Sequence, residues 1–267
     1  MLKVSRSGYY AWDNRPKSER AVENETITEQ IKVIHKKKRQ TCGSRKITAE
    51  IRRSGRLVNH KRIERLMKDA GIRSKMATKF KATTNSKHSL PVAENLLNRE
   101  FVADKPNQKM VSDITYLWTD EGWLYIAGVM DLYGQKMVGL SMSERMTKEL
   151  VINALKSAWL HGGRPSGVLI HSDRGSQYCS KDYQNFLNRY GFICSMSRKG
   201  NCWDNAPMEA FWGKMKYEWL HDRHFRTRDE ARSAVFEYVE IFYNRNRLHE
   251  SNGYLTPDEY YNTTIAA

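Results

Sequence analysis

The sequence predicts an α/β domain with a mixed β-sheet flanked by helices, preceded by a small all-α module with a helix-turn-helix-like pattern. In the second part of the chain, three consecutive strand-like runs are followed by alternating helical and strand-like segments, which is typical of a mixed sheet. Charge separates the two parts. Residues 1–105 carry 26 basic and 11 acidic side chains, while residues 106–267 carry 19 of each, so the whole net charge of +15 lies in the N-terminal part.

The position of this charge predicts the class of partner. A basic module joined to a domain without excess charge is typical of a protein that binds a polyanion, and nucleic acid is the expected partner. An anionic membrane surface is the competing interpretation. It would require an amphipathic helix with large apolar residues opposite the basic face, and we find no clear one.

Length and composition exclude several classes of protein. A chain of 267 residues with 40% hydrophobic residues can form one or two domains with real cores. No apolar run approaches the roughly 18 residues of a membrane-spanning helix, and the N-terminus has no apolar signal core, so we expect neither an integral membrane protein nor a secreted one. The four cysteines form no C-x-x-C pair and are too sparse for a disulfide scaffold, which favours a cytoplasmic location.

Two helices are predicted at the start of the basic module. Residues 20–38 are expected to be helical because Ile27, Ile31 and Ile34 recur at helical spacing before a basic run. Ser44 is predicted to cap a second, short helix, which ends at the turn of residues 54–55. The inward positions of this second helix are Ile47 and Ile51.

A third helix completes the helix-turn-helix-like pattern. It is predicted to begin at the cap Asn59 and to stop at Gly71, with Ile63, Leu66, Met67 and Ala70 facing inward. Its outward positions include a cationic stripe at i, i+4, i+7, which could follow a phosphate backbone or could be a solvated helix face. The basic residues of the module that we expect to contact DNA are Arg45, Lys46, Lys61, Arg62, Arg65 and Lys68.

A polar and basic segment without periodicity separates the two parts, and we interpret it as a linker. The predicted organisation is a basic helical module over residues 1–73, a linker over residues 74–104, a catalytic core over residues 105–225 and a helical extension over residues 226–267. The predicted strands of the core are 110–118, 123–131, 136–142, 168–171 and 192–196, and its predicted helices are 148–159, 181–189 and 206–220.

Three acidic residues lie at positions that suit chemistry better than stability. Asp113 interrupts the first strand, Asp173 follows a short apolar strand, and Glu209 lies in the first turn of a helix. Strand ends and helix starts that meet at one edge of an α/β sheet commonly form its functional site. Each residue also has a structural interpretation, as an outward strand residue, a turn former and a helix-dipole partner respectively.

The segments around these acids resemble a known family. Asp113 lies in S-D-I-T-Y, Asp173 in H-S-D-R-G-S-Q-Y and Glu209 in N-A-P-M-E-A-F-W, with 35 residues between the last two acids. This pattern closely resembles the catalytic core of insertion-sequence transposases of the DDE and retroviral-integrase superfamily. The resemblance extends to C-G-S-R-K-I-T-A-E (residues 42–50), N-L-L-N-R-E-F (residues 95–101) and a closing motif of Tyr243, Asn244, Arg247, Leu248, His249, Thr256 and Pro257.

The resemblance implies a ribonuclease-H-like fold and a transposase that cleaves DNA and transfers strands at the ends of an insertion sequence. It implies that Asp113, Asp173 and Glu209 hold two Mg²⁺ ions, with Mn²⁺ as a substitute, and that Asp113 bridges both ions. Carboxylates suit this task because magnesium demands oxygen ligands, and two ions can activate the attacking oxygen and stabilise the leaving one. Lys216, two helical turns after Glu209, would hold a phosphate nearby, or would be a solvated lysine.

Other polar and aromatic residues near the acids have mainly structural interpretations. The stripe of Met208, Phe211, Trp212, Met215 and Trp219 is expected to be core rather than a base-stacking platform. His171 is expected to be a structural histidine rather than a group that tunes the site. The polar loop with Asn201, Trp203, Asp204 and Asn205 could touch DNA or position Glu209.

The expected partners are double-stranded DNA, both insertion-sequence ends and target, and further copies of the chain. The resemblance is to the subgroup encoded in two overlapping frames, so an upstream-frame helix-turn-helix protein or a frameshift fusion is a further expected partner. Two alternatives remain: a nuclease of the same fold that cuts without joining, and a non-catalytic DNA-binding regulator.

Overall fold

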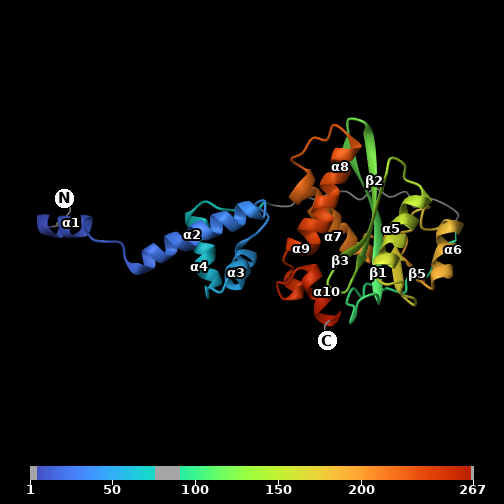
Figure 1. The fold of residues 1–267 in the computed structure, drawn as a ribbon, viewed down its shortest axis with the longest axis horizontal. Helices are drawn as coiled ribbons and strands as arrows, with labels where there is room; N and C mark the ends of the chain where they lie inside the picture. Colours follow the sequence, from blue (N-terminus) through green and yellow to red (C-terminus); the bar gives the residue numbers. More distant parts are fainter. Residues whose placement is uncertain (1–4, 76–90, 266–267) are drawn as a thin grey trace. The chain divides into compact units, whose positions relative to one another are not determined.

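The computed structural model describes residues 5–75 and 91–265 and divides the chain into two compact units, Met1–Met76 and Ala77–Ala267 (Figure 1). The charge excess predicted a division in this region. The boundary itself falls among residues 76–90, so that part of the predicted linker lies outside the described residues. Throughout the described segments, every helix is too short or too polar to cross a lipid bilayer.

The N-terminal unit has a three-helix core, as the apolar spacing predicted. Helices α2 (Glu19–Lys37), α3 (Ser44–Arg53) and α4 (His60–Asp69) pack through one cluster of buried side chains. These side chains are Ile27, Ile31, Cys42, Ile47, Ile51, Val58, Ile63, Leu66 and Met67. A further helix that the sequence analysis did not predict, α1 (Arg6–Asp13), precedes them and contributes no buried residue.

The ends of these helices test the predicted caps. Asn59 caps α4, because its side chain accepts the Lys61 N–H at 2.8 Å. The prediction for Ser44 was wrong: Gly43 is the N-cap of α3, and the Ser44 hydroxyl lies 3.0 Å from His60 Nε2 instead. Ala70 was also predicted wrongly as a core residue, since it follows the last turn of α4 and is exposed.

The second unit is built on a five-stranded mixed sheet with strand order β3-β2-β1-β4-β5. The strands are β1 (Lys109–Thr119), β2 (Gly122–Asp131), β3 (Lys136–Ser143), β4 (Leu169–Ser172) and β5 (Ile193–Met196). The first three form an antiparallel meander, and β4 and β5 are added in parallel. Strand β4 pairs with β1 only along Lys109–Val111, so these two strands diverge where β4 ends.

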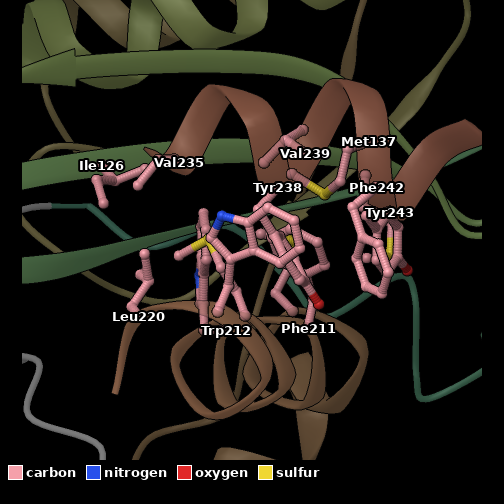
Figure 2. Close-up of a cluster of buried hydrophobic side chains, with 14 of the residues drawn as sticks. Ile126, Met137, Phe211, Trp212, Leu220, Val235, Tyr238, Val239, Phe242 and Tyr243 are labelled. Carbon is pink, nitrogen blue, oxygen red and sulfur yellow. The ribbon is translucent and has the colours of Figure 1, made fainter. Parts of the chain in front are cut away.

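Helices cover both faces of the sheet (Figure 1). Helices α5 (Lys148–His161) and α6 (Lys181–Tyr190) cover one face. The other face packs against α7 (Ala206–Met215), its π-helical continuation η2 (Lys216–Leu220), and the helical segments α8 (Arg228–Phe236) and η3 (Glu237–Tyr243). Figure 2 shows the side chains that fill this second layer. The chain then continues through α9 (Asn244–Asn246) and η4 (Glu250–Asn252) to α10 (Pro257–Ile265).

Residues 91–104 differ from the predicted linker. Leu97 is 1% exposed in the core of the second unit, and the Ser195 hydroxyl accepts the Leu96 and Leu97 N–H groups at 2.9 and 3.0 Å. Asn95 Nδ2 donates to Asp204 at 3.0 Å. This segment therefore belongs to the core, because its apolar and amide groups find partners on β5 and on the loop before α7.

The C-terminal extension is held to α7 by a buried ion pair. The Arg247 guanidinium donates to both Glu218 carboxylate oxygens, at 2.7 to 3.2 Å, and the Tyr238 hydroxyl donates to the same carboxylate at 3.0 Å. The side chains of Arg247 and Glu218 are 10% and 7% exposed. Bidentate geometry and a third donor satisfy the buried charges, so this contact joins η2 to the end of the chain.

Gly128 on β2 allows α7 to lie close to the sheet. A Cβ atom at this position would be 2.9 Å from two ring carbons of Trp212 and 2.8 Å from Met137 Cε. We therefore expect Gly128→Ala to lower the free energy of unfolding by about 1 to 3 kcal/mol, as overpacked cores do. Urea unfolding of the two proteins measures this difference, with Gly213→Ala as the control because a Cβ there meets no neighbouring atom. Equal loss in both variants would contradict the packing explanation.

Candidate active site

The three predicted acids lie on three elements that meet at the divergence of β1 and β4. Asp113 is in β1, where it pairs with Gly128 of β2, and residues that pair across strands share one face of the sheet. Since Trp212 packs over Gly128, Asp113 faces the side covered by α7. Asp173 follows the end of β4, and Glu209 lies in the first turn of α7.

The start of α7 is fixed directly beside Asp113. Asn205, which precedes α7, donates from Nδ2 to the Ser112 carbonyl at 3.1 Å. The Ser112 hydroxyl in turn donates to the Gly128 carbonyl at 3.0 Å and lies 3.0 Å from the Tyr178 hydroxyl. These contacts hold the helix that carries Glu209 against the strand that carries Asp113.

A tight turn fixes Asp173 at the end of β4. The Gly175 N–H donates to Asp173 Oδ1 at 2.8 Å. A Cβ at Gly175 would lie 3.0 Å from the same oxygen, so the absence of a side chain lets the backbone approach the carboxylate. The turn leaves the Asp173 side chain partly exposed at the edge of the sheet.

The three carboxylates interact electrostatically. Burial, followed by the charge of Asp173, raises the pKa of Asp113 well above its usual value, and the charge of Glu209 raises it further. Burial and then Asp173 also raise the pKa of Glu209. Each acid thus makes the ionised form of another less favourable, which is the behaviour of carboxylates that a cation would stabilise.

Among the residues that the structure describes, no three His, Cys, Asp or Glu side chains are already gathered as a metal-binding group. The three acids are within electrostatic range of one another, but they do not form a closed ligand shell. A divalent cation would make their proximity more favourable, because like charges at close range repel one another without a cation between them.

Lys216 lies beside Asp113, two turns along the helix from Glu209. Burial lowers the pKa of Lys216, and the charge of Asp113 acts in the opposite direction. The Lys216 amine lies 5.1 Å from the centre of the ring of Tyr116, a residue of β1. The partly buried lysine is therefore not a freely solvated side chain, and its charge interacts with the Asp113 carboxylate.

Comparison with known proteins identifies both units. Models of the integrase core domain match residues 103–202 and 190–257, and a model of an HTH-like domain matches residues 22–80. The chain is 50% identical over 254 residues to an uncharacterized 31 kDa protein of insertion element IS600 from Shigella sonnei, which covers 95% of this chain and 93% of that protein. It is 42% identical over 268 residues to the transposase InsF for insertion sequence IS3A from Escherichia coli K12, covering 100% and 93%.

The chain belongs to the insertion-sequence transposases. Its predicted membership of the DDE and integrase superfamily, and its function as a DNA transposase with an integrase catalytic core, are confirmed. A solved structure, the simian T-cell lymphotropic virus intasome in complex with the PP2A regulatory subunit B56 gamma, shares the fold with a TM-score of 0.51 and 16% identity, covering 88% of this chain and 74% of that one. The predicted ribonuclease-H-like fold is therefore also confirmed.

Asp204 of the transposase is a structural residue that sequence reasoning did not single out from its loop. It is fully buried and accepts the Arg198 N–H, the Arg198 guanidinium and the Arg99 guanidinium at 2.8 to 3.0 Å. These donors hold its pKa far below the usual value. The loop that precedes α7 is thus anchored from within, while its Trp203 is 69% exposed. The anchored loop joins the start of α7, which carries Glu209, and its contact with DNA stays a prediction.

The predicted aromatic stripe of the transposase is core. Met208, Phe211, Trp212, Met215 and Trp219 are all at most 7% exposed and pack against the sheet (Figure 2). The Trp212 indole N–H is buried and has no hydrogen-bond partner among the described residues, although it is close enough to Asp113 to lower the pKa of that acid slightly.

His171 is a structural histidine, as predicted. It is fully buried, with Nδ1 at 2.8 Å from the Ser195 hydroxyl and Nε2 at 3.1 Å from the Ser197 hydroxyl. Ser195 already accepts two backbone N–H groups, so it donates to Nδ1, and the neutral ring carries its proton on Nε2. Burial lowers the pKa of His171 to about 4.

This histidine makes the stability of the transposase depend on pH. Because the folded pKa is below the ordinary value near 6.5, the unfolded chain binds the proton more readily, and stability falls as pH falls from about 6.5 to about 4. We expect wild type to lose up to about 3 kcal/mol more than His171→Gln over this range. Urea unfolding at several pH values measures the difference. Parallel pH profiles for the two proteins would contradict the assignment.

The basic candidates on the N-terminal unit do not all have the same surroundings. Lys61, Arg65 and Lys68 are exposed on one side of α4. Arg62 instead reaches α2, where it donates to Asn24 at 2.9 Å and to Glu23 at 2.7 Å. Arg45 is exposed and Lys46 is partly buried at the start of α3. The stripe remains available to a phosphate backbone, whereas Arg62 also has a structural task within its own unit.

Proposed function

We propose that the transposase cleaves DNA strands at the ends of an insertion sequence and joins them to target DNA, using Asp113, Asp173 and Glu209 as its catalytic carboxylates. The observation that carries this assignment is the mutual electrostatic effect of these acids at the divergence of β1 and β4. Carboxylates that repel one another in a partly buried site are suited to chemistry that a divalent cation assists.

The donor set fits two Mg²⁺ ions, with Mn²⁺ as a substitute. All three side chains offer oxygen ligands, and burial with the charges of Asp173 and Glu209 raises the pKa of Asp113, which a bound cation would offset. As the family resemblance implies, Asp113 would contact both ions, and Asp173 and Glu209 would each complete one. When bound, the ions lower the pKa of an attacking water or 3′ hydroxyl and offset charge on the leaving oxygen.

DNA contacts are proposed for both units. Lys216 would hold a phosphate beside Asp113, since its charge interacts with the Asp113 carboxylate. The cationic stripe of α4 would follow the backbone of double-stranded DNA; it consists of Lys61, Arg65 and Lys68. Further phosphate contacts would come from Arg45 and Lys46 of α3 and from Arg62 of α4. The excess positive charge of the N-terminal part supports this proposal because phosphate contacts dominate the affinity of such modules.

Further copies of the chain, and an upstream-frame helix-turn-helix protein or its fusion, are proposed as partners on DNA. Joining two ends of an element requires two sites to act together, which favours a homo-oligomer assembled on DNA. The proposed location follows from the substrate: the bacterial cytosol, at the nucleoid.

A joining assay tests the proposal. Duplexes that carry the repeats flanking the gene are incubated with Mg²⁺ or Mn²⁺ and wild type, with Glu209→Gln as the matched variant. Products that link donor to target with wild type alone are the expected result. Hydrolysed ends without joined products would favour the nuclease alternative. Salt-sensitive binding by both proteins without products, unchanged by adding the frameshift fusion, would favour the regulator.

A further inference from the structure

The hairpin of β1 and β2 carries four aromatic side chains on one face, which we name the aromatic ladder: Tyr116, Trp118, Trp123 and Tyr125. Trp118 pairs with Trp123 and Tyr116 with Tyr125 in the strand register. Paired residues lie on the same side of a sheet, so the four rings form a continuous group. Ring centres are 4.8 Å apart for Trp118 and Trp123, 5.0 Å for Tyr116 and Trp123, and 6.4 Å for Tyr116 and Tyr125.

The outer end of the aromatic ladder is exposed. Trp118 is 55% and Trp123 is 42% exposed, while the two tyrosines are partly buried. All three contacts are edge-to-face, an arrangement in which one ring of each pair keeps a face directed away from its neighbour. Two adjacent exposed tryptophans form an apolar patch of the kind that marks an interaction site.

The inner end of the aromatic ladder is linked to the candidate active site through Lys216. Tyr116 lies three residues after Asp113 on β1, so the two side chains face opposite sides of the sheet, and the Lys216 amine is 5.1 Å from the centre of the Tyr116 ring. The same lysine interacts with Asp113. A path of contacts therefore runs from the carboxylates through Lys216 and Tyr116 to the exposed tryptophans, along the part of β1 that β4 does not cover.

The outer end of the aromatic ladder carries both acidic and basic side chains. Glu121 accepts the backbone N–H of Arg228 at 2.8 Å, at the start of α8. Glu144 lies 3.5 Å from the guanidinium of the same arginine, whose Nε also donates to the Trp123 carbonyl. Arg228 thus offsets part of this acidic charge, Asp120 in the hairpin turn lies 3.0 Å from His224 Nε2, and Lys216 lies at the inner end.

We propose that the aromatic ladder stacks unpaired bases of the DNA strand whose phosphate is held at Asp113, and so keeps the end of the duplex open at the active site. The inference rests on the proposed function. Aromatic rings stack on any base, which suits contact without sequence preference, and a lysine between the rings and the carboxylates suits the intervening phosphate. An intact duplex hides its base faces, so the strand that fits this surface is a separated one.

Base stacking is measured without chemistry, in metal-free buffer. The probe is a duplex of the insertion-sequence end with 2-aminopurine at the terminal positions, and the proteins are wild type, the double variant Trp118→Ala with Trp123→Ala, and the corresponding double Phe variant. We expect wild type and the Phe variant to change the fluorescence of the probe, and the Ala variant to lose this change. Phe236→Ala is the control, because it removes another aromatic side chain, 54% exposed, from the same unit.

Joining kinetics give a second readout that a structural role would not produce. We expect the double Ala variant to join fully paired ends at least about ten-fold more slowly than wild type, since stacking on one base is worth about one to two orders of magnitude. Ends that are already unpaired by mismatches should reduce this defect. A fluorescence change that persists in the Ala variant, or an equal defect on both kinds of end, would overturn the proposal. So would a loss of self-association with unchanged probe fluorescence, which would assign the surface to a second copy of the chain.

The two proposals fail in different ways. If wild type joins no DNA, the fluorescence readout still reports whether the ladder binds unpaired bases. If wild type joins DNA and the ladder variant behaves like Phe236→Ala in both readouts, the ladder proposal alone is rejected.

Discussion

Asp113→Asn should abolish strand cleavage and joining while leaving the metal-free protein more stable than wild type. Activity should fall at least about a thousand-fold, about 4 kcal/mol, because an amide is a weak ligand for Mg²⁺ and the metals supply much of the stabilisation of charge. Stability should rise because burial and the charges of Asp173 and Glu209 make an ionised Asp113 unfavourable in the folded state. A neutral side chain removes that cost.

Thermal unfolding with and without Mg²⁺ separates the two effects. Wild type should gain stability on addition of Mg²⁺, whereas Asp113→Asn should begin at a higher Tm and gain little. Asp229→Asn is the matched control, since its side chain is 89% exposed and pairs only with the exposed Arg232 among the contacts described here. DNA binding should be the same for all three proteins. A lower metal-free Tm for Asp113→Asn than for Asp229→Asn would contradict the electrostatic explanation, and near wild-type turnover would exclude Asp113 from catalysis.

Arg247→Met should destabilise the second unit by about 3 to 5 kcal/mol, because it leaves the Glu218 carboxylate buried without its partner. Only the Tyr238 hydroxyl would remain to donate to that carboxylate among the groups described above. In a unit of this size the loss corresponds to a fall in Tm of roughly 10 °C. The lost contact lies on the continuation of α7, so we expect the position of the Glu209 side chain to become less well defined. The rate of DNA joining should therefore fall even at temperatures below the Tm.

A double variant separates the cost of an unpaired charge from the loss of packing. Adding Glu218→Gln to Arg247→Met removes the buried charge, and we expect it to restore most of the lost stability. Arg232→Met is the control, because that arginine forms an exposed pair with Asp229 and should cost less than about 1 kcal/mol. If the double variant is as unstable as Arg247→Met alone, packing of the arginine side chain, not its charge, holds the C-terminal extension.

Much of the fold could be predicted from periodicity. The five strands were placed within one or two residues of their positions, since buried strands have compact apolar runs bounded by turns. The helix that carries Glu209 has the predicted extent, but its last turn is a π-helix, and apolar spacing does not distinguish an α-helix from a π-helix. Residues 91–104 were assigned to a linker because their order depends on hydrogen bonds that this segment donates to Ser195 and Asp204, which are about 100 positions away in the sequence.

The candidate acids could be selected only by the family resemblance of their surrounding segments, because 30 acidic residues give many pairs at any spacing. Two features could not be predicted from the sequence. These are the pairing of Asp113 with Gly128 across β1 and β2, and the close packing of Trp212 that this glycine permits. The structural role of Asp204 could not be predicted from the polar loop that contains it. That role depends on hydrogen bonds from two arginines and an asparagine, which only the folded chain brings close to the carboxylate.

The contact between Glu218 and Arg247 has a consequence for synthesis of the protein. The Arg247 guanidinium, which pairs with Glu218 on the continuation of α7, is synthesised long after the N-terminal unit. The N-terminal unit has its own apolar core and is complete far earlier. An incomplete translation product therefore carries the basic module without a finished catalytic unit.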